Sequence, residues 1–199
     1  SGGKADLIVG KDSMVRAEAA EAKVAVTHLA CLTGQDGKTT QTGLVCVARD
    51  DKALTAADLK DHKILFGPAK AEEKHAAALL LLEELGVPAP AKVETCPTCT
   101  DGATKVIEQA KNGEKVATVI SSYALALLEG CATIKKGDIR VVGETDPVPF
   151  IAAFATGALS TGEAAAVKAA LLAVGGDKAL CAVLETKNGF VEPEPAKKK

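Results

Sequence analysis

Short apolar runs alternate with longer amphipathic stretches along most of the chain. The apolar runs at residues 5–10, 63–67 and 115–120 predict short buried strands. The amphipathic stretches at residues 71–85 and 101–111, each closed by a turn that contains Gly, predict helices. Strands that alternate with helices of this length are typical of an α/β fold, with mainly parallel sheet flanked by helices.

The region near the start of the chain predicts a pair of strands rather than a strand and a helix. Residues 23–32 and 44–48 are rich in β-branched and apolar residues, and an Asp-Gly turn signal lies between them at Asp36. We expect these two strands to pair as a hairpin or through a longer turn. Such pairing would bring Cys31 and Cys46 close together.

Composition narrows the choice of function. The 199 residues carry a formal net charge of -2, so no broad basic surface is available for nucleic acid. No apolar run approaches the roughly 18 residues of a membrane span. One Tyr and no Trp cannot form an aromatic cage for a quaternary amine. The three lysines at residues 197–199 are expected to form a solvated tail.

Six cysteines form an even set, which favours an oxidising compartment and therefore a periplasmic or secreted protein. Two residues separate Cys96 from Cys99, and the pair lies just before a predicted helix, where a thiol can serve in redox chemistry. A local disulfide and a soft-metal site that includes Met14 are the other interpretations of this pair. The sequence offers too few ligands for a zinc site, and we assign no residue to a metal centre.

No pattern in the sequence indicates catalysis or a cofactor. No Ser or Cys stands beside a His in the chain, and His28, His62 and His75 show no spacing typical of a triad. Phosphate-binding, dinucleotide-binding and metalloprotease motifs are also missing from the sequence. We therefore expect a protein that is not an enzyme and needs no cofactor.

Polar residues repeatedly follow the predicted strands and precede the predicted helices. In α/β sheets, ligands bind at such junctions, where helix N-termini offer backbone N–H groups. Each junction can equally be an ordinary helix cap. The candidates for ligand binding are Lys11, Asp12, Ser13, Lys70, Thr100, Asp101, Ser121, Tyr123, Glu144 and Asp146.

The order of segments resembles the phosphate/phosphonate family of periplasmic solute-binding proteins that feed ABC transporters. Residues 54–67 carry a leucine, an Asp-Leu-Lys run and a closing glycine in the family's order. Each motif is short, and their order along nearly the whole chain carries the resemblance. The other similar segments are residues 3–8, 82–87, 103–114, 140–149 and 188–191.

This resemblance implies a type II periplasmic-binding-protein-like fold with two lobes. The first lobe would comprise residues 1–46 and 140–199, with its N-terminal part incomplete, and the second residues 47–139. Chain crossings near Val47 and Arg140 would form a hinge. The implied function is capture of a small polar or anionic solute in an interlobe cleft. The partners would be that solute and an ABC transporter permease or a sensor protein.

The sequence departs from the family where a Ser/Thr-rich phosphate loop is expected. After Gly67 the chain continues with Pro, Ala, Lys70, Ala and then Glu72 and Glu73, whose charges oppose an anion unless Lys70 compensates. Two alternatives therefore remain beside solute capture. One is a thiol–disulfide or soft-metal protein centred on Cys96 and Cys99, and the other is a partner-binding sensor module with a degenerate pocket.

Overall fold

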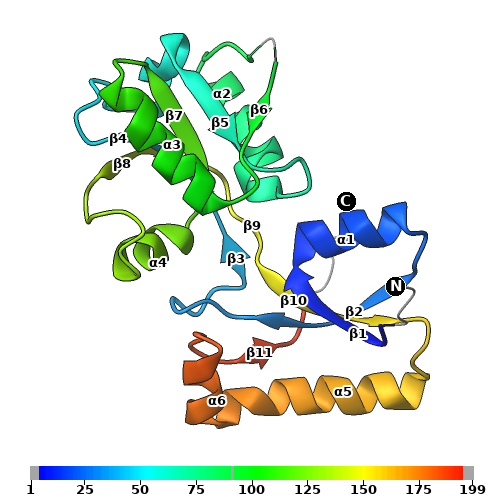
Figure 1. The fold of residues 1–199 in the computed structure, drawn as a ribbon. Helices are drawn as coiled ribbons and strands as arrows, with labels where there is room; N and C mark the ends of the chain where they lie inside the picture. The colour runs from blue at the N-terminus through cyan, green and yellow to red at the C-terminus, as the bar shows by residue number, and fades with distance from the viewer. Residues whose placement is uncertain (1–4, 91, 195–199) are drawn as a thin grey trace. The chain divides into compact units, whose positions relative to one another are not determined.

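The computed structural model describes residues 5–90 and 92–194, so the lysines at residues 197–199 lie outside the described residues. The chain forms two compact units (Figure 1). Unit 1 comprises Ser1–Thr40 and Pro149–Lys199, and unit 2 is Gln41–Val148. The two short strands β3 (Thr40–Gln41) and β9 (Val148–Pro149) pair where the chain passes between the units.

Unit 1 is a four-stranded sheet with helices, in the order β1-β10-β2-β11. Neighbouring strands in this sheet are all antiparallel. Its elements are β1 (Leu7–Lys11), α1 (Asp12–Glu21), β2 (Val26–Leu32), β10 (Ile151–Thr156), α5 (Thr161–Ala173), the 3₁₀ turn η3 (Val174–Gly176), α6 (Lys178–Val183) and β11 (Phe190–Val191).

Unit 2 is a five-stranded mixed sheet, in the order β6-β5-β7-β4-β8. Strand β5 is parallel to β6 and β7, whereas β4 is antiparallel to β7 and β8. The elements are β4 (Gly43–Ala48), the 3₁₀ helix η1 (Ala56–Asp61), β5 (Lys63–Phe66), the 3₁₀ turn η2 (Glu72–Lys74), α2 (Ala76–Glu84), β6 (Glu94–Thr95), α3 (Cys99–Lys111), β7 (Val116–Ser121), α4 (Ala124–Gly130) and β8 (Ile139–Glu144).

The α/β class is confirmed, but the expectation of mainly parallel sheet is wrong. In unit 1, β1 and β2 run in the same direction, yet β10 lies between them and pairs antiparallel with both. Strand β10 belongs to the segment that returns from unit 2, and no strand is predicted from the sequence at residues 151–156. A returning strand placed between two earlier ones converts a parallel arrangement into an antiparallel one.

The chain passes between the units a few residues outside the predicted boundaries. Val47 lies in β4 and Arg140 in β8, and these two residues are paired with each other inside the sheet of unit 2. Unit 2 therefore includes the whole of both strands. The predicted hairpin of residues 23–32 and 44–48 is also wrong, because β2 belongs to unit 1 and β4 to unit 2.

The stretch predicted as one long helix over residues 71–85 is broken at His75. This residue has φ −126° and ψ −83°, which ends η2 before α2 begins. The ring nitrogen Nδ1 of His75 lies 2.9 Å from the carbonyl oxygen of Gly67, so Nδ1 carries the hydrogen and donates it. Because of the break, Glu72, Glu73 and Lys74 lie in η2 and not on the first turn of the predicted helix.

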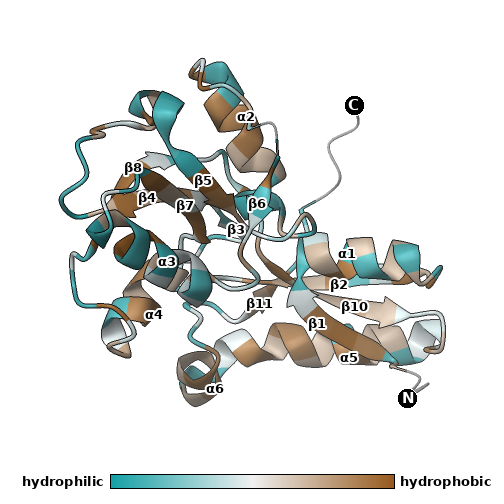
Figure 2. Ribbon diagram, turned by 45° about the horizontal axis from the view of Figure 1, so that its top comes forward, coloured by the Kyte–Doolittle hydropathy of each residue, from teal (hydrophilic) through white to brown (hydrophobic). Residues whose placement is uncertain are grey.

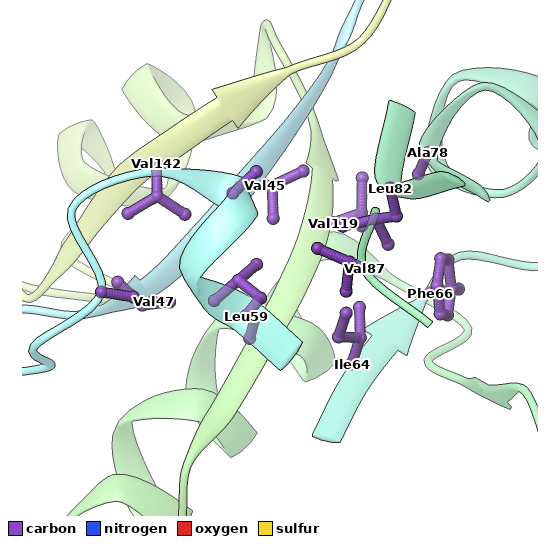
Figure 3. Packing of buried hydrophobic residues seen from close by; sticks show 13 residues of the cluster. Val45, Val47, Leu59, Ile64, Phe66, Ala78, Leu82, Val87, Val119 and Val142 are labelled. Atoms are coloured by element: carbon purple, nitrogen blue, oxygen red, sulfur yellow. The ribbon is translucent and has the colours of Figure 1, made fainter. Parts of the chain in front are cut away.

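The core of unit 2 has two layers, one on each face of the sheet. Val45 and Val47 of β4 face one layer, while Cys46 between them faces the other, as the alternation of a strand requires. Figure 3 shows the first layer, in which Leu59 of η1 and Phe66 of β5 lie among side chains from β4, β7 and α2. In Figure 2, β4 and β7 are mostly hydrophobic, whereas α3 also carries hydrophilic residues.

We expect Phe66→Ala to lower the free energy of unfolding by about 3–5 kcal/mol, because it removes a fully buried ring and leaves a cavity. The matched control is Leu54→Ala, since Leu54 is 76% exposed. We expect the control substitution to change the free energy of unfolding by no more than about 0.5 kcal/mol. Urea unfolding followed by circular dichroism measures both, and equal losses would contradict the assigned packing.

Candidate functional site

The parallel strands of unit 2 end at one edge of the sheet, which we call the carboxyl edge. Strands β5 and β7 stop there at Phe66 and Ser121, and α3 begins there at Cys99. Strand β4 runs the other way, so its first residue, Gly43, is paired with Ser121. Ligands of α/β sheets bind outside this edge, next to the amino ends of the helices.

The turn η2 packs directly onto the carboxyl edge because two glycines admit it. A Cβ atom at Gly43 would lie 2.0 Å from the backbone oxygen of Glu73, and one at Gly67 would lie 2.6 Å from the Cβ of Lys74. The backbone N–H of Gly67 donates to the carbonyl oxygen of Lys74 at 3.0 Å. The missing side chains at these two positions therefore fix where Glu73 and Lys74 lie.

Glu73 and Lys74 are both buried at the carboxyl edge. Glu73 is 0% exposed, and its Oε1 accepts a hydrogen bond of 2.7 Å from the hydroxyl of Ser121. Lys74 is 6% exposed, and its Nζ donates to the sulfur of Cys99 at 3.7 Å. The same sulfur accepts from the backbone N–H of Ser121 at 3.5 Å. These contacts link an ammonium, a thiol, a hydroxyl and a carboxylate.

The amino end of α3 is capped by its own residues. Thr98 is the N-cap, and its hydroxyl oxygen accepts from the backbone N–H of Asp101 at 3.0 Å. The Asp101 carboxylate accepts in return from the N–H of Thr98 at 3.2 Å and from its hydroxyl at 2.7 Å. The two candidate residues Thr100 and Asp101 therefore lie inside the first turn of the helix, and the carboxylate of Asp101 has a structural role.

A second polar group lies where β4 begins and β8 ends. The hydroxyl of Thr42 donates to Oε1 of Glu144 at 2.6 Å. The backbone N–H of Thr42 donates to the hydroxyl of Ser122 at 3.2 Å, which joins this group to the end of β7. The structure therefore brings two of the predicted residues, Ser121 and Glu144, to the same edge.

The remaining predicted residues of unit 2 lie on the turns around this edge. Tyr123 is the exposed N-cap residue of α4, and its side chain makes no capping hydrogen bond. Lys70 lies in the turn between β5 and η2, and Asp146 follows β8 as an exposed residue. Their roles in binding stay predictions.

The three predicted residues of unit 1 lie together at the junction of β1 and α1. Lys11 ends the strand, and Asp12 and Ser13 open the helix. Asp12 is buried and does not cap the helix, because its two carboxylate oxygens accept from Arg16 at 2.6 and 3.1 Å. An ion pair with a residue one turn along the same helix therefore occupies the carboxylate.

Arg16 extends this ion pair to a histidine and a cysteine on β2. Its Nη2 lies 3.3 Å from Nδ1 of His28, and since arginine can only donate, Nδ1 accepts. In the neutral ring the hydrogen is then on Nε2, which lies 3.2 Å from the sulfur of Cys31. Burial lowers the pKa of His28 and raises the pKa of Cys31, so both groups are held in their neutral forms.

The cysteines do not form the predicted disulfides. All six are free thiols, including Cys96 and Cys99, and Cys31 and Cys46 belong to different units. Within residues 5–90 and 92–194, no group of three or more His, Cys, Asp or Glu side chains could hold a metal ion. Met14, the proposed third ligand, belongs to unit 1, whereas Cys96 and Cys99 belong to unit 2.

The sequence matches the family described as "ABC transporter, phosphonate, periplasmic substrate-binding protein" over residues 3–198. The chain belongs to this family. The resemblance inferred from the order of its segments is therefore confirmed. No curated protein sequence matches the chain significantly.

Several solved structures share the fold of this chain. The chain resembles a binding protein component of an ABC phosphonate transporter from Pseudomonas aeruginosa, with a TM-score of 0.75 and 14% identity over 94% of this chain and 63% of that one. It also resembles PhnD1 from Prochlorococcus marinus in complex with methylphosphonate, with a TM-score of 0.70 and 14% identity. That match covers 95% of this chain and 73% of PhnD1. A third similar structure is XAC2383 from Xanthomonas citri bound to ATP, with a TM-score of 0.71 and 16% sequence identity. The match covers 96% of this chain and 72% of that one.

Membership of this family supports a solute-binding role in ABC transport, with a small-molecule ligand and a permease as partner. Substrate-binding proteins of this kind are not enzymes. The comparisons lend no support to the thiol–disulfide and soft-metal alternatives. In the described part of the chain, no helix is long and apolar enough to span a membrane.

The sequence did not reveal the part that Glu73 and Lys74 play. In a continuous helix these residues would have belonged to its first turn, and a run of charges there indicates a solvated face. Their burial depends on the break at His75 and on the close approach to Gly43 and Gly67. A pair of glycines at the ends of two strands was the available signal, since glycine at such positions often marks close backbone contact.

We expect Gly43→Ala to destabilise the protein by about 1–3 kcal/mol, because its Cβ would overlap the backbone oxygen of Glu73. Gly130→Ala is the control, since a Cβ there would meet nothing within 4 Å. Thermal unfolding of the two variants measures the difference. A Gly43 variant as stable as the Gly130 variant would show that η2 is not packed against β4.

We expect the thiols to react with iodoacetamide in an order set by their surroundings. Burial raises the pKa of Cys46 to about 12, whereas a hydrogen bond with Thr133 lowers the pKa of exposed Cys131. At about pH 8, Cys131 therefore has the larger thiolate fraction and reacts first, and Cys46 reacts only on unfolding. Mass spectrometry of peptides, taken at several reaction times, measures the rate of modification at each cysteine. Equal rates at Cys131 and Cys46 would contradict this prediction.

Proposed function

We propose that this chain captures a small anionic or polar solute in the periplasm, and that the carboxyl edge of unit 2 supplies the group that attracts it. The observation that carries this proposal is the burial of Lys74. A lysine ammonium is rarely buried without a partner of opposite charge. Within the described residues, the only hydrogen-bond partner of this ammonium is the sulfur of Cys99, and no carboxylate lies within ion-pair distance.

An anion placed beside Lys74 would supply the missing charge. The amino end of the 13-residue helix α3 lies at the same edge and carries the positive end of the helix dipole. Ser121 and Cys99 add polar atoms within reach of the same point. The oxygen atoms of a phosphonate or a sulfonate suit such a combination of an ammonium with a helix end. We propose that Lys70 and Tyr123 of the same unit contribute further contacts, and Lys11 and Ser13 of unit 1 stay predictions.

We expect Lys74→Met to weaken the binding of methylphosphonate or methanesulfonate by at least about tenfold, because a charged hydrogen bond is lost. Methionine keeps the length of the side chain and suits a buried position, so the fold should persist. Lys60→Met is the control, since Lys60 is an exposed residue of η1 in the same unit. Titration calorimetry measures both variants against the unmodified chain.

Two outcomes would count against this proposal. Equal affinities of the two lysine variants would show that the buried ammonium does not contact the solute. Failure of the unmodified chain to bind methylphosphonate, methanesulfonate and inorganic phosphate would favour the alternative of a partner-binding sensor module.

A further inference from the structure

A cavity of about 890 Å³ lies at the edge of the unit 2 sheet opposite the carboxyl edge. We call this the amino edge, because β5 and β7 begin there at Lys63 and Val116, while β4 ends there at Ala48. Cavities that bind small molecules usually have volumes of about 300–1,000 Å³, so this one is large enough for a ligand. The proposed function makes no use of it.

Three segments of unit 2 form most of the cavity wall. The first wall belongs to residues 48–53, the second to residues 107–115 at the end of α3, and the third to residues 135–138 before β8. Nε and Nη2 of Arg49 in the first wall donate to two carbonyl oxygens of the third, at 2.6 and 3.0 Å. The first and third walls are therefore tied to each other.

The first wall is also held by a buried pair of side chains, His62 and Asp51, which are 7% and 10% exposed. Nε2 of His62 lies 3.1 and 3.2 Å from the two carboxylate oxygens of Asp51. The same carboxylate accepts from the backbone N–H of Ala53 at 2.8 Å, and Nη2 of Arg140 donates to the carbonyl oxygens of Asp51 and Ala53. A wall fixed in this way loses little conformational entropy when a ligand binds.

Many of the charged side chains at the cavity already have partners. Of the five carboxylates that line it, those of Asp51, Asp58 and Asp138 accept hydrogen bonds from a ring or from backbone N–H groups. Of the five Lys and Arg residues, Arg49 is bonded to the third wall, and Lys115 lies 3.6 Å from a carboxylate. These five groups serve the structure of the protein.

The three remaining lysines have no partner among residues 5–90 and 92–194, and each belongs to a different wall. They are Lys52 in the first wall, Lys111 in the second and Lys135 in the third, all exposed residues. Each ammonium can donate three hydrogen bonds and has no acceptor supplied by the described protein. The two remaining carboxylates, Asp50 and Glu114, can accept hydrogen bonds from hydroxyl groups.

We propose that the cavity at the amino edge is a second binding site, which takes a small organic molecule with two or three anionic groups. Carboxylate and phosphate groups both form charge-assisted hydrogen bonds with ammonium groups. A ligand with several such groups can contact more than one wall at once, whereas a ligand with one can contact a single lysine. This inference does not rest on the proposed function, because it uses no residue of the carboxyl edge.

Citrate and pyrophosphate are the probes, since one carries three carboxylates and the other two linked phosphates. Acetate is the control ligand with a single anionic group. Titration calorimetry at neutral pH and about 0.15 M salt keeps distant surface charges screened. We expect the unmodified chain to bind citrate or pyrophosphate at least about tenfold more tightly than acetate. The tighter of the two probes shows whether the site prefers carboxylates or phosphates.

The double substitution Lys111→Gln and Lys135→Gln tests the lysines of two walls. We expect it to weaken binding of the tighter probe by about tenfold, because each contact of an exposed ammonium contributes a factor of about two to five. Lys60→Gln with Lys92→Gln is the matched control. It removes the same charge from exposed residues of the same unit outside the cavity, and we expect a change of less than about twofold.

The outcomes distinguish this inference from the proposed function. Equal losses in the two double variants would show a general effect of charge and overturn the inference. A loss of citrate and pyrophosphate binding in Lys74→Met would place both probes at the carboxyl edge and would also overturn it. If neither probe binds more tightly than acetate, the inference fails, while the titrations with methylphosphonate and methanesulfonate still decide the proposed function. Circular dichroism checks that each variant folds, and the three ligands compared on the unmodified chain need no variant.

Discussion

The hydrogen bond from Ser121 to Glu73 holds a carboxylate where water does not reach it. Removing a charge from water is costly, so such a group persists only where nearby polar groups are fixed in place. Here the fixing is done by the sheet, because Ser121 is the last residue of β7 and Gly43 of β4 is paired with it. The position of the carboxylate thus depends on the register of two strands.

The same constraint explains the break between η2 and α2. A continuous helix through His75 would place its carbonyl and N–H groups in the helical hydrogen-bond ladder. Instead, the N–H of Gly67 donates to the carbonyl of Lys74, and the ring of His75 donates to the carbonyl of Gly67. These two bonds tie the end of β5 to η2. With the break at His75, Glu73 and Lys74 lie in η2 and are buried at the carboxyl edge.

The sequence was sufficient for elements whose signals are local. The strand at residues 116–121 is buried on both faces, and the helix over residues 99–111 is closed by a turn that contains Gly, so the first was predicted to within one residue and the second to within two. The antiparallel pairing in unit 1 was missed because it depends on where β10, a strand distant in sequence, enters the sheet. The break at His75 was missed because it depends on a contact with Gly67, which lies eight residues earlier, directly after β5.

The sequence predicted that polar residues gather at the strand ends, but it did not predict which of them already have a partner within the fold. Asp12 and Asp101 both stand at the predicted junctions, yet Arg16 and Thr98 already take their carboxylates. Lys74, which no local pattern singled out, is the buried charge without a carboxylate beside it in the described structure. A cap and a binding group look alike in sequence, since both need a polar side chain at a helix end. What separates them is whether the fold has already supplied a partner, and only packing decides that.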